Sequence, residues 1–217
     1  MGSPRKNKAN QTTIRVSPGL LTKAIAQMST KQRTWLAKTG FKNLLGFSFS
    51  STPHELAHRI LTTYDIEKQC LNLGEKTIQL TEEDVNRVLG FPRGSEQVQF
   101  AKDSAVAKAW EAQFSTVPSR ITPKEIFDKM KSTVDVTANF KRNFLVVLAN
   151  TMISPPKDAF ATKDLAGFRG DLDQLYNYNW CSYTLSKLKN AVRMWREKPA
   201  MPFTVPLHFM VVSFSCF

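Results

Sequence analysis

Apolar residues along this chain recur mostly at helical spacing, with one short stretch where apolar and polar residues alternate. Apolar positions three and four residues apart predict helices over residues 20–28, 31–38, 105–114, 140–153 and 180–195. Thr77–Leu80 alternates instead, and Gly74-Glu75 offers a turn just before it, which predicts a short hairpin. The pattern therefore predicts a mainly α protein, a single helical domain with one small β-hairpin near residues 70–80.

The helix that follows the hairpin carries signals for both of its ends. The Thr81 hydroxyl can accept a backbone N–H at the helix start, and Asp84 can reach back to the Thr81 N–H. Gly90 suits the left-handed turn that ends a helix, and Pro92 prevents the helix from continuing. We therefore expect a rigid corner of strand, short capped helix and turn.

Two longer helices are predicted further along the chain. Residues 140–153 are apolar nearly all round, so we expect this helix to be the buried centre of the fold. In residues 180–195 an apolar stripe repeats at three and four residues, beginning at Trp180. Four cations fall off that stripe and predict a basic outer face: Lys187, Lys189, Arg193 and Arg196.

Length and composition narrow the class of protein. With 217 residues, 42% of them hydrophobic, the chain can bury a sizeable core. Its three cysteines, Cys70, Cys181 and Cys216, are too scattered for a disulfide framework, which predicts a reducing intracellular compartment. No apolar run is long enough to predict a membrane helix. No glycine-rich phosphate loop is present, so we expect no cofactor and no small-molecule substrate.

The net charge of +12 lies mainly at the two ends of the chain. Residues 1–54 hold nine Lys or Arg and no Asp or Glu, while residues 176–217 hold five cations against Glu197. We expect a disordered basic tail over residues 1–16, followed by a helical domain over residues 17–217 that is truncated at its C-terminus. Clustered cations suit phosphate backbones, which predicts nucleic-acid binding through Lys187, Arg193 and Arg196. A merely solvated basic surface is the alternative.

One short phrase matches a metalloprotease pattern. His54-Glu-Leu-Ala-His58 has the H-E-x-x-H spacing, in which two histidines hold zinc and Glu55 would be the general base. However, Thr52-Pro53 precedes it as a helix cap, which places His54 in the first turn rather than in a rigid mid-helix site. We expect His54 and His58 to be a solvent-exposed pair at a helix start, with no metal.

Two blocks of the sequence resemble a known family, the plant mobile domain, also named "aminotransferase-like". The first is Ile78–Gly94, which fits the phrase I/L-x-L-T-x-E-D-V-x-x-V-L-G-F/L-P-x-G. The second is Tyr178-Asn-Trp-Cys-Ser-Tyr-Thr-Leu, which is similar to the phrase that opens a long helix in that family. The likeness covers about residues 34–206.

This resemblance implies a non-enzymatic nuclear binding or assembly module of a transposon-derived plant protein, associated with chromatin or nucleic acid and with nuclear partners. Related chains often carry a SUMO-type (ubiquitin-like) cysteine protease domain, so the alternative is the non-catalytic N-terminal part of such a protein. A zinc peptidase at His54, Glu55 and His58 is a third interpretation. No protease triad can be assigned, because Cys181 precedes His208, and Cys216 follows His208 too closely.

Overall fold

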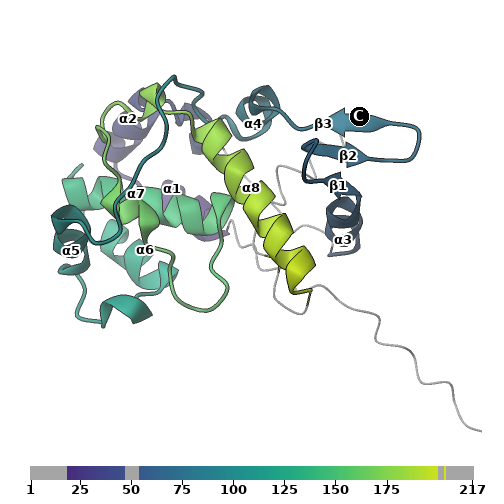
Figure 1. Ribbon diagram of the computed structural model, residues 1–217. Helices are drawn as coiled ribbons and strands as arrows, with labels where there is room; N and C mark the ends of the chain where they lie inside the picture. The colour runs from purple at the N-terminus through teal and green to yellow at the C-terminus, as the bar shows by residue number, and fades with distance from the viewer. Residues whose placement is uncertain (1–18, 47–53, 200–202, 204–217) are drawn as a thin grey trace, which may run out of the picture.

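The computed structural model describes residues 19–46, 54–199 and 203, and for residues 54–57 the backbone alone. The predicted tail over residues 1–16 and the predicted C-terminal truncation fall outside the described residues. The prediction of a mainly α protein with a small sheet is confirmed (Figure 1). The α-helices are α1 (Gly19–Ala26), α2 (Thr30–Lys38), α3 (His54–Thr63), α4 (Glu82–Leu89), α5 (Ala105–Glu111), α6 (Pro123–Lys131), α7 (Ala138–Leu148) and α8 (Trp180–Glu197).

Shorter elements join these helices. The 3-10 helices are η1 (Lys42–Gly46), η2 (Pro118–Arg120), η4 (Asp164–Gly167) and η5 (Leu175–Asn177), and η3 (Ala149–Ile153) is a π-helix. One connected hydrophobic core runs through the described residues from Leu21 to Phe203. In Figure 1, α8 lies diagonally between a helical part containing α1, α2, α5, α6 and α7 and the sheet with α3.

The small sheet contains the predicted hairpin and one further strand. Strand β2 (Cys70–Asn72) pairs antiparallel with β3 (Thr77–Gln79), and Leu71 faces Ile78. The turn contains Gly74 at a left-handed φ of 80°. Strand β1 (Tyr64–Asp65) adds to the other side of β2 directly after α3. The sequence does not predict β1, because its two residues form a strand only through pairing with β2.

The corner at α4 has the predicted caps. The Asp84 N–H donates to the Thr81 hydroxyl over 3.2 Å, and the Thr81 N–H donates to the Asp84 carboxylate over 2.9 Å. Losing a cap of this kind costs about 1 kcal/mol of stability. Gly90 ends the helix with φ 66°, and a Cβ there would lie 2.4 Å from the Asn43 Cβ. This corner therefore also fixes the distance between α4 and η1.

Helix α7 is the buried centre of the helical part, as predicted. Its residues from Asn143 to Leu148 are all buried, and Trp35 packs edge-on against Phe140 and Phe144. The prediction of one regular helix to Ile153 is wrong at the last turn, because η3 is a π-helix closed by Ser154 N–H donating to the Ala149 carbonyl.

The buried Asn150 side chain explains why this irregular turn is useful. Asn150 Nδ2 donates to the Val146 carbonyl over 2.7 Å and to the Thr162 carbonyl over 2.8 Å. The Thr162 N–H donates back to Asn150 Oδ1 over 2.7 Å. The Asn150 amide thus forms hydrogen bonds both with a carbonyl of its own helix and with the backbone of the loop that follows. An apolar side chain at this position could form neither.

Two loops far apart in the sequence pair through their backbones, and we call this pairing the loop junction (residues 92–101 with 167–180). Each loop both donates and accepts hydrogen bonds, and the pairing forms isolated bridges rather than a regular strand. Their donor and acceptor pairs are Trp180 N to Pro92 O (3.0 Å), Glu96 N to Asn177 O (2.9 Å), Asn179 N to Glu96 O (2.7 Å), Arg169 N to Gln99 O (3.0 Å) and Ala101 N to Gly167 O (2.9 Å).

Glycines allow the two loops to approach this closely. A Cβ on Gly94 would lie 2.0 Å from the Asn177 carbonyl carbon, and a Cβ on Gly167 would lie 2.0 Å from the Ala101 carbonyl oxygen. In both cases the obstacle is backbone, which cannot rotate away as a side chain can. The loop junction therefore requires glycine at these two positions.

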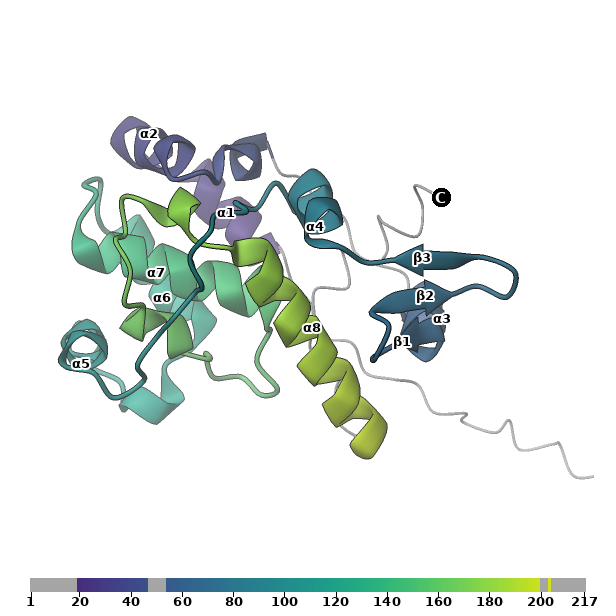
Figure 2. The same cartoon turned by 45° about the horizontal axis from the view of Figure 1, so that its top comes forward.

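The loop junction also positions the start of α8. The Trp180 indole N–H donates to the Leu175 carbonyl over 2.9 Å, and the Cys181 thiol donates to the Phe91 carbonyl over 3.3 Å. Burial raises the pKa of the Cys181 thiol to about 12, so the thiol stays protonated. The two sequence blocks around α4 and α8 thus lie against each other (Figure 2).

The inner face of α8 differs from the predicted stripe. Trp180, Thr184 and Leu188 are buried as predicted, but Ala191 and Trp195 are only half-buried. Cys181, Leu185 and Val192 are buried instead. The helix is therefore rotated relative to the predicted orientation, because it packs on α4 as well as on the helical part.

We expect Gly94→Ala to destabilise the protein strongly, because the added methyl group would overlap the Asn177 carbonyl carbon. A loss of about 3 kcal/mol or more in the free energy of unfolding is consistent with overpacking against a rigid backbone. Gly46→Ala is the matched control, since no atom lies within 4 Å of its added Cβ. Urea unfolding followed by circular dichroism measures both variants, and equal stability of the two would contradict the role of the junction.

Candidate nucleic-acid interface

The three cations predicted to bind nucleic acid do not share one face of α8. Successive residues of an α-helix are about 100° apart around the axis, so Arg193 lies about 120° from Lys187. Arg193 and Arg196 are three residues apart and share a side of the helix. The prediction of one basic face containing all three is therefore wrong, because Lys187 lies toward the loop after η3, whereas Arg193 is exposed.

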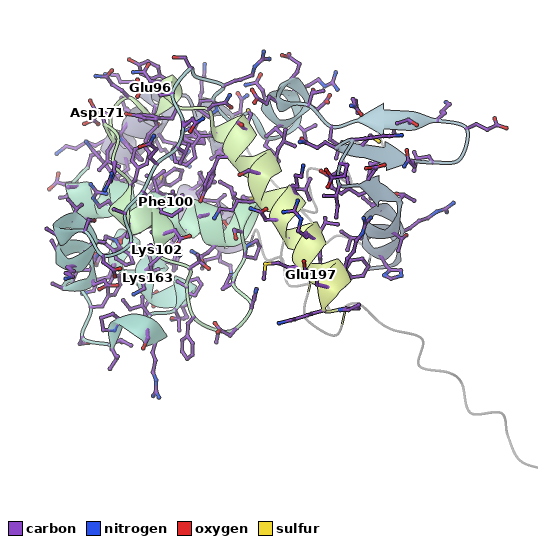
Figure 3. The ribbon with its side chains drawn as sticks, viewed as in Figure 1. Glu96, Phe100, Lys102, Lys163, Asp171 and Glu197 are labelled. Carbon is purple, nitrogen blue, oxygen red and sulfur yellow. The ribbon has the colours of Figure 1, made fainter. Side chains whose placement is uncertain are left out.

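Lys187 is engaged inside the protein. Its Nζ lies 5.5 Å from the centre of the Phe100 ring, 5.2 Å from that of Tyr183 and 3.7 Å from Asp164 Oδ2. Asp164 also pairs with Lys102 over 3.1 Å (Figure 3 labels Phe100 and Lys102). The Lys187 side chain is only 24% exposed. A phosphate would have to displace both the rings and the carboxylate, so Lys187 acts as a structural cation.

The surroundings of Lys187 also explain why the Tyr183 hydroxyl stays protonated. Burial is the main reason that the pKa of Tyr183 is raised above its ordinary value, and the negative charge of Asp164 adds to it. The ring therefore stays neutral and presents its face to Lys187. Sequence reasoning missed this arrangement, although Tyr183 and Lys187 are four residues apart on a helix, a spacing that lets side chains meet.

Arg196 is also partly used within the fold. Its guanidinium donates to the backbone carbonyl of Tyr64, which attaches the end of α8 to β1. Asp65 is beside it, in a groove of about 520 Å³ between the sheet and α8. Arg193, in contrast, is exposed and has no ion pair with another described residue. Of the three predicted residues, only Arg193 is presented to solvent without such a role.

The elements α1, α2 and η1 carry cations and no acidic residue. Residues 19–46 contain five cations and no Asp or Glu. Lys31 pairs with Asp135 over 3.0 Å, but both side chains are mostly exposed, so this pair is weak. We use the name α2 basic surface for the three cations of α2 and η1 that have no acidic partner among the described residues: Arg33, Lys38 and Lys42. Arg33 and Lys38 are five residues apart and lie about 140° from each other around α2, so these cations are spread around the helix and do not share one face.

The α2 basic surface is built on a well-anchored helix. Ser29 caps α2 through its hydroxyl, and the Ser29 N–H donates to Gln32 Oε1 over 3.0 Å. Trp35 and Leu36 fix the inner side of the helix in the core. Lys38 and Lys42 are exposed, and Arg33 is half-buried. The charges therefore project from a rigid element, and no carboxylate has to be displaced before a phosphate can bind.

A groove with a mixed lining lies between α8 and the loop after η3. Its volume is about 530 Å³, and Pro155, Phe160, Ala191 and Met194 supply apolar atoms. Lys157, Asp158 and Lys187 supply charges, and Ser119 and Ser154 supply hydroxyls. Among the described residues that line it there is no histidine or cysteine, so these residues pair no hydroxyl with an imidazole base.

The metalloprotease phrase lies at the start of α3, which begins at His54, and the expected cap at Thr52-Pro53 lies outside the described residues. The side chains of His54 and Glu55 lie outside the described residues. His58 is half-buried, and its ring meets the Trp195 ring edge-on with centres 6.1 Å apart. The prediction that His58 is exposed to solvent is therefore wrong, because α8 packs against this helix. Among the described residues, no three His, Cys, Asp or Glu side chains are grouped as metal ligands would be.

None of the helices in the described part of the chain has the length and apolar character needed to cross a membrane.

We expect His58→Ala to leave the zinc content of the purified protein unchanged and to lower its melting temperature slightly. The reason is that His58 contacts Trp195, so its loss removes packing rather than a ligand. Elemental analysis after dialysis against a chelator measures the metal. One equivalent of zinc that disappears in His58→Ala would contradict the assignment.

Comparison with known proteins identifies a family. The family model described as "Domain of unknown function (DUF8566)" matches residues 14–211, which is most of the chain. Searches of curated proteins and of solved structures find no match. The matched range includes α1 to α8, the loop junction and the α2 basic surface. The chain therefore belongs to the DUF8566 family.

Proposed function

We propose that this protein is a non-enzymatic nuclear module of a transposon-derived plant protein, and that it binds nucleic acid through phosphate contacts with the α2 basic surface. The observation that carries the proposal is the acid-free segment of residues 19–46, whose Arg33, Lys38 and Lys42 lack acidic partners among the described residues. The proposal moves the interface from α8 to α2, because Lys187 and Arg196 are engaged within the fold.

The electrostatics support this choice. A net charge of +12 attracts polyanions over several ångströms, and locally clustered cations gain most from releasing counterions from a phosphate backbone. Elsewhere in the described chain, many cations are paired with carboxylates, as in Lys102–Asp164, Lys124–Asp128 and Lys163–Glu111. The three cations of the α2 basic surface have no such carboxylate partner among the described residues.

The plant and nuclear parts of the proposal rest on the sequence likeness. The blocks Ile78–Gly94 and Tyr178–Leu185 resemble the two most recognisable phrases of the plant mobile domain. They lie against each other at α4 and α8, as expected for residues that maintain one shared structural feature. This likeness supports a common fold and an assembly role in the nucleus, where nucleic acid is the abundant polyanion.

We expect the protein to bind duplex DNA of any sequence with an affinity that falls steeply as salt is raised. If Arg33, Lys38 and Lys42 each meet one phosphate, changing all three to Gln should flatten the log–log salt slope by about 3. Fluorescence anisotropy with a labelled duplex at several salt concentrations measures the slope. Thermal melting checks that the variant remains folded.

A charge-matched control separates a defined surface from diffuse charge. Lys68, Lys76 and Lys108 are exposed; the first two lie in the turns that join the strands, and Lys108 lies on α5. Changing these three to Gln should alter the slope by less than about 1. Equal effects of the two triple variants would contradict a defined interface, and absence of binding at low salt would overturn the proposed function.

A further inference from the structure

We infer that the α2 basic surface takes single-stranded nucleic acid, with the exposed ring of Tyr176 as a stacking platform for one base beside Lys38 and Lys42. This inference rests on the proposed nucleic-acid function and specifies its ligand. Tyr176 is 48% exposed although it belongs to η5, whose Leu175 is fully buried. An aromatic face beside two cations matches the chemistry of an unpaired nucleotide.

Gly40 brings Tyr176 beside the two cations. Gly40 ends α2 with a left-handed φ of 89°, and Lys38 and Lys42 lie two residues before and after it. A Cβ on Gly40 would lie 3.0 Å from the Tyr176 Cβ and 2.8 Å from the Pro92 Cγ. The turn between α2 and η1 therefore packs directly on the base of the Tyr176 side chain, and the two lysines flank this turn in the sequence.

The loop that carries Tyr176 is held rigidly. In Figures 1 and 2 this loop, which leads into α8, lies beside α2. The Trp35 indole N–H donates to the Leu172 carbonyl over 3.2 Å, and the Trp180 indole N–H donates to the Leu175 carbonyl over 2.9 Å. Two buried tryptophans thus fix the backbone on the N-terminal side of Tyr176. A platform fixed in advance loses little entropy when a base stacks on it.

The acidic residues of the same loop have partners of their own. Asp173 forms an ion pair with Lys141, and Asp171 accepts hydrogen bonds from the Asp173 N–H and from Gln174. No carboxylate of this loop pairs with Lys38 or Lys42 among the described residues. The two lysines therefore stay available for phosphates on either side of a stacked base.

Stacking of a base on Tyr176 would make the protein prefer single-stranded over double-stranded nucleic acid. A base inside a duplex already stacks on its neighbours, so its face cannot reach a protein ring unless the duplex opens. An unpaired base has its face free, and stacking on an aromatic side chain stabilises binding of any base. Phosphate contacts alone would bind single strands and duplexes alike. Tyr176 should therefore contribute to binding of single strands and not of duplexes.

The test compares an oligothymidylate of about 20 nucleotides with a duplex of the same length, both fluorescently labelled. Tyr176→Ala should weaken binding of the single strand between about 5- and 150-fold and change duplex binding less than about 2-fold. Tyr176→Phe, which keeps the ring, should restore single-strand binding. Val117→Ala is the control, since Val117 is 62% exposed and lies after α5, in a different segment of the chain.

The outcomes are distinguishable. A single strand that contains bromouracil should crosslink to Tyr176 on irradiation. Mass spectrometry of the peptides identifies the crosslinked residue. If Tyr176→Ala leaves single-strand binding unchanged, or weakens both probes equally, the stacking site is overturned while phosphate binding stands. If the unaltered protein binds neither probe at low salt, the proposed function fails and the stacking site fails with it.

Discussion

The backbone hydrogen bonds of the loop junction are the interaction on which the other parts of the structure depend. They join residues 92–101 to residues 167–180, about 80 positions further along the chain, which makes them costly in loop-closure entropy. Gly94 and Gly167 allow the close approach that repays this cost, because each lies where any side chain would meet backbone. The junction fixes the ends of the α4 corner and the start of α8 in one place.

The candidate interface follows from the same constraint. Once the junction and the indole of Trp180 fix the loop before α8, Tyr176 stands beside the turn at Gly40. The orientation of α8 then directs Lys187 toward Phe100 and Asp164, which uses its charge internally. Because Lys187 and Arg196 of α8 are engaged within the fold, the candidate interface is the acid-free segment around α2. In this protein the packing of a helix therefore decides which cations can meet a ligand.

Local features of the fold could be predicted from the sequence, and features set by distant residues could not. The Thr81 cap and the Gly90 turn depend on atoms within four residues, so their residue types identify them. Strand β1 and the π-helix η3 depend on pairing and packing with other elements, and no local sequence pattern predicts them. For the interface, the positive bias of the first residues was visible in the sequence. The internal role of Lys187 was not, because it depends on how far α8 is rotated.

Native-state hydrogen exchange at the loop junction tests this account most directly. The amides of Glu96, Ala101 and Asn179 lie outside regular helices and strands, and such amides usually exchange through small local openings. If the junction holds the fold together, these three amides should exchange only through global unfolding, with the same free energy as amides in the middle of α7. Exchange at the rate of the exposed turn at Gly74 would show that the loops open independently, and would contradict the central role of the junction.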